Sequence, residues 1–173
     1  MDPHAPLNTN SPLEQPLQDA IKLFTALNIP YALIGSITAM TYTGGKFSEN
    51  LDFVVGANYQ EALAANPDVM RSCNFDTASA RKLHHSTGFE IDIWENADSD
   101  AIAARARTVR FGDQDLRVAE PHDLIATLLL AKRAQDNYDI SEILKHVSID
   151  EALLQSRVTS EQFVHYQSIK ARR

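Results

Sequence analysis

Two short stretches, Tyr31-Ala-Leu-Ile-Gly-Ser36 and Asn50-Leu-Asp-Phe-Val-Val55, decide how the fold is interpreted. The first predicts a buried strand that ends at a glycine-serine turn and leads into a helix of small residues over 37–43. The second predicts another strand, and because side chains alternate across a strand, Asn50 and Asp52 share one of its faces. A carboxylate inside an otherwise apolar strand is costly unless it is paired or bound to a cation. Asp52 is therefore a candidate site residue.

A second acid lies in Phe89-Glu-Ile-Asp-Ile-Trp94, which shows the clearest alternation in the chain. This pattern predicts a strand with Glu90, Asp92 and Trp94 on one face. If the two strands are neighbours, the carboxylates of Asp52 and Asp92 converge on one hard divalent ion, which prefers oxygen ligands. The plainer alternative, favoured for each acid taken singly, is that it lies near a strand end and faces water or a lysine.

The Gly35-Ser36 turn and the loop after the small-residue helix supply candidate phosphate contacts. Backbone N–H groups at a glycine-serine turn that opens a helix approach a phosphate closely, and the helix dipole favours the negative charge. The alternative is a plain tight turn in which Ser36 caps the helix. Lys46, in the loop, is within reach of a triphosphate, although a solvated loop lysine is the more common case.

Together these segments resemble the core of the nucleotidyltransferase-fold proteins, and more narrowly the minimal and abortive-infection-type nucleotidyltransferase-like group. In that family a hydrophobic strand ends in Gly-Gly or Gly-Ser, an Asp-x-Asp pair follows, and a later strand adds a third acid, as Asp92 does here. The resemblance covers about residues 13–146 and implies an α/β (α+β) fold with a mixed central sheet, flanking helices and a C-terminal helical region. Further matching segments are Gly44-Gly-Lys-Phe-Ser48, the Gly112 hairpin, Glu120-Pro-His-Asp-Leu-Ile125 and Arg133-x-x-Asp136-x-x-Asp139-Ile140.

The resemblance implies metal-dependent transfer of a nucleoside monophosphate from a nucleoside triphosphate to an acceptor hydroxyl on a protein, an RNA or a small molecule. Carried over residue by residue, Asp52, Asp92 and Asn50 are the catalytic and metal-binding positions for Mg²⁺ or Mn²⁺. Gly35 and Ser36 are the phosphate contacts, and Lys46 is added to them as a nucleotide-binding candidate.

Asn50 departs from the family pattern, which has an aspartate at this position. An asparagine carbonyl can bind a metal, but it is neutral and cannot bridge two ions as a carboxylate does. The alternative function is therefore a catalytically degenerate module that binds a nucleotide or a cognate protein, for example in a toxin–antitoxin-like pair. A third hypothesis is an α/β scaffold whose acids are all structural.

Composition narrows the function classes. The net charge of −7 argues against broad nucleic-acid binding, which depends on Lys and Arg neutralising phosphates. One cysteine allows neither an internal disulfide nor a thiolate zinc site. The N-terminus does not resemble a signal peptide, and the longest apolar run, 124–131, is too short to cross a membrane. We therefore expect a cytoplasmic protein.

The organisation expected along the chain is a flexible leader over 1–12, an α/β core over 13–118 and a helical subdomain over 119–173. Patterning predicts strands over 31–34, 51–55, 75–77, 82–85, 89–94, 108–111 and 115–118, and helices over 13–27, 37–43, 59–65, 101–107, 121–134, 140–146, 150–155 and 160–171.

Overall fold

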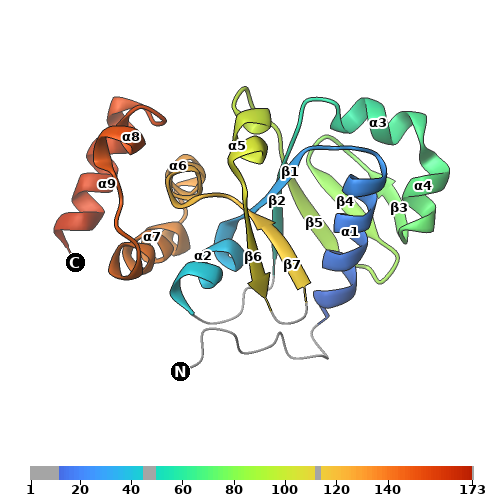
Figure 1. Ribbon diagram of the computed structural model, residues 1–173, viewed down its shortest axis with the longest axis horizontal. Coiled ribbons are helices and arrows are strands. Elements are labelled where there is room, and N and C mark those ends of the chain that lie inside the picture. The colour runs from blue at the N-terminus through green and yellow to red at the C-terminus, as the bar shows by residue number, and fades with distance from the viewer. Residues whose placement is uncertain (1–11, 45–49, 112–113, 173) are drawn as a thin grey trace.

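The computed structural model describes residues 12–44, 50–111 and 114–172, and Figure 1 shows its helices on both sides of one sheet. In chain order the elements are α1 Glu14–Ala26, β1 Tyr31–Ile34, α2 Gly35–Thr43, β2 Leu51–Val55, α3 Tyr59–Ala65, α4 Pro67–Ser72, β3 Phe75–Ala78, β4 Lys82–His85, β5 Glu90–Trp94, α5 Ser99–Arg105, β6 Arg107–Phe111, β7 Gln114–Val118, α6 Pro121–Ala131, α7 Ala134–His146, α8 Glu151–Gln155 and α9 Ser160–Ala171.

The strands form a seven-stranded sheet in the order β3-β4-β5-β2-β1-β7-β6. Two pairings are parallel, β2 with β5 and β1 with β7, while the other pairs are antiparallel. The predicted mixed sheet, with flanking helices and a helical C-terminal region, is therefore confirmed. This order brings β5, which carries the second acid, directly beside β2.

The sheet is covered on both faces, and every residue of β1 and β2 is buried. Along β1, Leu33 packs into one apolar cluster while Ala32 and Ile34 pack into another, as the alternation of side chains requires. The first cluster includes residues of α1 and α3, and the second includes residues of α5 to α9. Figure 1 shows α1, α3 and α4 on one side of the molecule and α6 to α9 on the other.

One helix was not expected from the sequence, and several helices begin or end at other residues than expected. The chain forms a further helix, α4, where we expected only an end at Asn66-Pro67, because Pro67 occupies a position in the first turn of a new helix. The helix expected over 101–107 is α5, Ser99–Arg105, and Arg107 already begins β6. The helix expected to end near residue 134 ends at Ala131, since Lys132 adopts a left-handed conformation.

The other C-terminal helix, expected over 140–146, begins six residues earlier, at Ala134. At this new start the Asp136 carboxylate reaches back and accepts from the Arg133 backbone N–H at 2.7 Å. The expected leader falls almost entirely on residues outside the described ranges. The second apolar cluster contains residues of the sheet and of the C-terminal helices. The expected boundary near residue 119, between an α/β core and a helical subdomain, stays a prediction. Within the described residues no helix is long and apolar enough to cross a membrane.

Candidate active site

Asp52 and Asp92 lie side by side on the two central parallel strands. The register of β2 with β5 pairs the two residues directly, so their Cα atoms are separated by about one inter-strand spacing, roughly 4.8 Å. The expectation that the two acidic strands are neighbours is therefore correct. The two carboxylates differ in environment: Asp52 is 5% exposed, whereas the side chain of Asp92 is 42% exposed.

Asp52 is held in a buried position by close contacts. Burial raises the pKa of its carboxyl, the charge of Arg133 opposes that rise, and the charge of Asp92 adds to it. The indole N–H of Trp94 donates to Asp52 Oδ1 at 3.4 Å. On the other side, a Cβ added at Gly35 would lie 2.6 Å from Asp52 Oδ2. Only glycine leaves room for the carboxylate there.

Asp92 faces a lysine. This agrees with the plainer alternative given above, in which each acid taken singly faces water or a lysine. The register of β4 with β5 places Lys82 opposite Asp92, and its Nζ lies 3.7 Å from Asp92 Oδ1. Lys82 also forms an ion pair with Glu90, which His84 Nδ1 approaches to 3.3 Å. The hydrogen bond to Glu90 raises the pKa of Lys82, so the ammonium stays charged beside the acids.

The Gly35-Ser36 turn opens α2 as expected, but Ser36 does not cap the helix. Gly35 adopts a φ of +70°, and the N-cap residue Ile34 has no side-chain group that could cap the first turn of α2. The Ser36 hydroxyl instead donates to Asp139 Oδ2 at 2.8 Å, and Gln135 donates to Asp139 Oδ1 at 2.8 Å. The start of α2 therefore lies beside Asp52, and among the described residues no side chain accepts from the N–H groups of Gly35 and Ser36.

Arg133 is a site residue that the sequence reasoning missed. Its backbone N–H donates to Asp136 Oδ2 at 2.7 Å, and its guanidinium also binds Asp136. Those hydrogen bonds, together with the charges of Asp136, Asp52 and Asp92, raise the pKa of Arg133. The signal was the Arg133-x-x-Asp136-x-x-Asp139 spacing, which entered only as part of the family resemblance.

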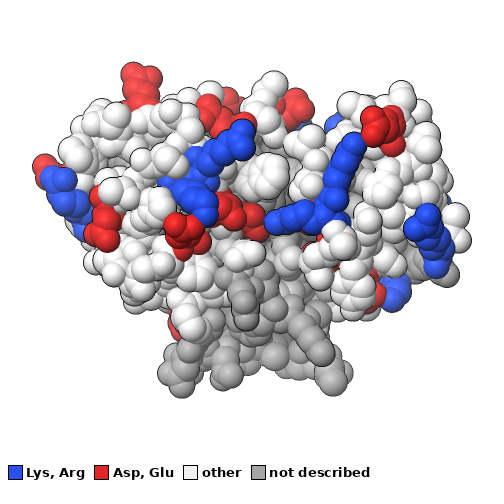
Figure 2. All heavy atoms as spheres, turned by 180° about the vertical axis from the view of Figure 1, so that it is seen from behind, with Lys and Arg blue, Asp and Glu red and all other residues white. Residues whose placement is uncertain are grey.

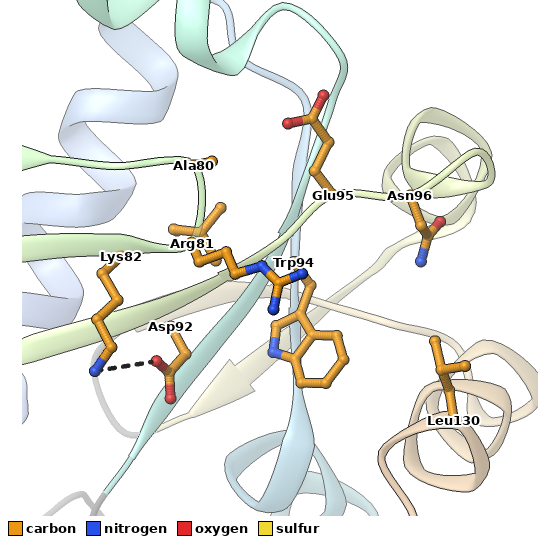
Figure 3. Close-up of a pocket in the computed structure, with 9 residues that line it drawn as sticks. Ala80, Arg81, Lys82, Asp92, Trp94, Glu95, Asn96 and Leu130 are labelled. Carbon is orange, nitrogen blue, oxygen red and sulfur yellow. Dashed lines mark ion pairs between the residues drawn. The ribbon is translucent and has the colours of Figure 1, made fainter.

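A cavity of about 520 Å³ opens beside Asp92. Figure 3 shows Arg81, Lys82 and Asp92 on one part of its wall, with Trp94 nearby and Leu130 reaching from α6. It is polar at the end near Asp92 and more apolar where the indole and Leu130 face it. The full lining is Ala80, Arg81, Lys82, Asp92, Ile93, Trp94, Glu95, Asn96 and Leu130.

The two other predicted site residues are Asn50 and Lys46. Asn50 is exposed and lies immediately before β2, and Lys46 lies outside the described residues. Among the described residues, no group of three or more His, Cys, Asp or Glu side chains is placed to hold a metal ion. In the view from behind Figure 1, basic and acidic side chains are interspersed, with no continuous basic area on that face (Figure 2).

Several solved structures resemble this chain, including the following two. One, an antigenic nucleotidyltransferase-like protein from Paracoccidioides brasiliensis, has a TM-score of 0.58 and 15% identity, over 95% of this chain and 88% of its own. The other, the lincosamide antibiotic adenylyltransferase LnuA bound to lincomycin, has a TM-score of 0.50 and 17% identity, over 78% of this chain and 98% of its own. No protein-family model and no curated protein sequence matches the chain.

Proposed function

We propose that this chain, which has the nucleotidyltransferase fold, transfers a nucleoside monophosphate from a nucleoside triphosphate to an acceptor hydroxyl. The observation that carries the proposal is the direct pairing of Asp52 with Asp92 beside the uncapped first turn of α2. Paired carboxylates next to free backbone N–H groups suit a ligand that combines phosphates with a cation. The narrower resemblance to the abortive-infection-type group stays a prediction.

The donor set fits one divalent cation. Asp52 and Asp92 offer carboxylate oxygens from adjacent strands, and Mg²⁺ is commonly held by one or two carboxylates together with substrate phosphates. Mn²⁺ suits the same oxygen ligands. The amide oxygen of Asn50, two residues before Asp52, is a third candidate donor without the charge needed to bridge a second ion. When bound, the cation would polarise the α-phosphate and neutralise charge that develops during transfer.

The residues around the pair would bind and orient the triphosphate. The N–H groups of Gly35 and Ser36 would approach the phosphates at the positive end of the α2 dipole. Lys82 and Arg133 place positive charge beside the two acids, which reduces the repulsion between these acids and the anionic substrate.

The transfer itself is an in-line displacement. The acceptor oxygen forms a bond to the α-phosphorus, the bond from that phosphorus to the bridging oxygen of the β-phosphate breaks, and pyrophosphate leaves. The hydroxyl proton passes to solvent. Because one solved structure of this fold is an adenylyltransferase, ATP is the first donor to test.

The test measures label transfer from each [α-³²P]-labelled nucleoside triphosphate, with Mg²⁺ or Mn²⁺, to acceptors in a cell lysate. We expect transfer that Asp52→Asn abolishes, because the substitution keeps the shape of the side chain and removes its charge. Asp68→Asn is the matched control, since Asp68 is 91% exposed on α4 and pairs with Arg71 at the surface. Absence of transfer from all four nucleotides, or equal transfer by Asp52→Asn, would count against the proposal.

A further inference from the structure

Trp94 contacts Asp52 and also lines the cavity. It is the single tryptophan of the chain, two residues beyond Asp92 on β5. Its indole N–H donates to Asp52, while the ring packs against the apolar cluster that α6 shares with the sheet. The side chain nevertheless remains partly exposed and lines the 520 Å³ cavity. A tryptophan needed only as core filling would have no reason to form a cavity wall.

Leu130 forms the wall of the same cavity on the side of α6. It is 50% exposed, so its side chain is accessible to a ligand in the cavity. Figure 3 shows it extending from α6 toward the space in front of the indole. The indole and Leu130 therefore give the cavity an apolar side, Lys82 and Asp92 give it a charged side, and Arg81 extends from beside Lys82 toward the indole (Figure 3).

The separation of these two sides suits a nucleotide. Asp92 and Trp94 lie on one face of β5 two residues apart, which places their Cα atoms about 6.6 Å from each other. A ribose joins the α-phosphate of a nucleotide to its base over a comparable length. A triphosphate next to Asp92 thus brings the base to Trp94.

We propose that Trp94 stacks on the nucleobase of the bound triphosphate, with Leu130 contacting the base from the side of α6. This inference rests on the proposed function and adds to it a base-binding subsite. Stacking on an aromatic ring tolerates every base, so Trp94 contributes affinity for any nucleoside triphosphate rather than choice among them. The same ring holds Asp52 by its N–H, so base contact and the position of the acid depend on one side chain.

The test compares Mg-ATP with Mg-tripolyphosphate, which lacks the ribose and base, by isothermal titration calorimetry. Trp94→Leu should weaken Mg-ATP binding about 5- to 150-fold, the range that loss of one stacking contact produces. Trp94→Phe keeps a ring and loses the N–H, and should stay within about threefold of wild type for Mg-ATP. Because both variants lose the N–H that Asp52 accepts, both should weaken Mg-tripolyphosphate binding by the same factor, and only Trp94→Leu should weaken Mg-ATP binding beyond it.

Leu130→Ser keeps the proposal testable if Trp94→Leu does not fold, because Leu130 is exposed and contributes little to the core. It should weaken Mg-ATP and leave Mg-tripolyphosphate unchanged, whereas the matched control Leu153→Ser, at another exposed leucine, should change neither. In wild type, Mg-ATP should change the fluorescence of the single tryptophan more than Mg-tripolyphosphate does, because only ATP brings a base to the ring.

Two results would overturn the inference while leaving the proposed function in place. Equal loss of both ligands in Trp94→Leu and Trp94→Phe would mean that Trp94 acts through Asp52. Unchanged Mg-ATP binding in Trp94→Leu and Leu130→Ser would mean that the base lies elsewhere. If wild type binds neither ligand, the proposed function fails and the inference fails with it.

Discussion

Replacing Gly35 with alanine would disturb Asp52 and the local backbone together. Gly35 has a φ of +70°, and an L-residue in the left-handed region costs about 1–2 kcal/mol. The added Cβ would lie 2.6 Å from Asp52 Oδ2 and 3.2 Å from Asp52 Cγ, so the carboxylate cannot simply rotate away. Overpacking of this kind typically costs about 1–3 kcal/mol. We therefore expect Gly35→Ala to lower the free energy of unfolding by about 2–5 kcal/mol.

Gly88→Ala is the matched control for the backbone effect. Gly88 also has a positive φ, +85°, but nothing lies within 4 Å of a Cβ added there. Both substitutions reduce the entropy of the unfolded chain similarly, so this contribution cancels between them. The difference between the two variants, about 1–3 kcal/mol, then reports the clash with Asp52 alone.

Urea denaturation gives the two free energies of unfolding, and calorimetry gives the affinity of each variant for Mg-ATP. We expect Gly35→Ala to be the less stable variant and to lose Mg-ATP binding, while Gly88→Ala binds Mg-ATP as wild type does. The reasoning is refuted if the two variants unfold at the same urea concentration and Gly35→Ala still binds Mg-ATP normally.

Two other predictions concern buried carboxylates. Burial alone would raise the pKa of Asp19, but hydrogen bonds to its carboxylate lower it to about 2. Its charged form therefore contributes about 2 kcal/mol of stability that is present above pH 4 and is lost as the pH falls through about 2, and urea denaturation between pH 2 and 6 should show that Asp19→Asn lacks this component. Asp139→Ala should lower the free energy of unfolding by about 1–3 kcal/mol because the Ser36 hydroxyl loses its acceptor, and Asp139→Asn, which retains a carbonyl acceptor, should cost less in the same assay.

The central strands were predictable because their signals are local. The apolar run that ends at Gly35 and the apolar run that contains Asp52 each indicate a buried strand from local sequence alone. The alternation around Asp92 indicates the strand face on which Asp92 lies. The adjacency of the two strands was a conditional expectation, which the pairing of β2 with β5 confirms. The family resemblance provided the order of these parts along the chain.

The remaining parts depend on contacts between distant segments. The early start of α7 rests on the hydrogen bond from the Arg133 backbone N–H to the Asp136 carboxylate, and α4 buries none of its residues, so it has no apolar period to recognise. Lys82 reaches Asp92 only because β4 pairs antiparallel with β5. Likewise, the bond from Ser36 to Asp139 spans 103 residues, and no local pattern predicts it.

The central claim is that Asp52 and Asp92 bind a divalent cation together with a triphosphate. Its most direct test is calorimetric titration of wild type, Asp92→Asn and Asn50→Asp with ATP, each in Mg²⁺ and in EDTA. We predict that wild type binds ATP only with Mg²⁺, that Asp92→Asn weakens this binding at least about tenfold, and that Asn50→Asp strengthens it by restoring a third carboxylate. ATP binding that is equally tight in EDTA, or unchanged in both variants, would contradict the claim.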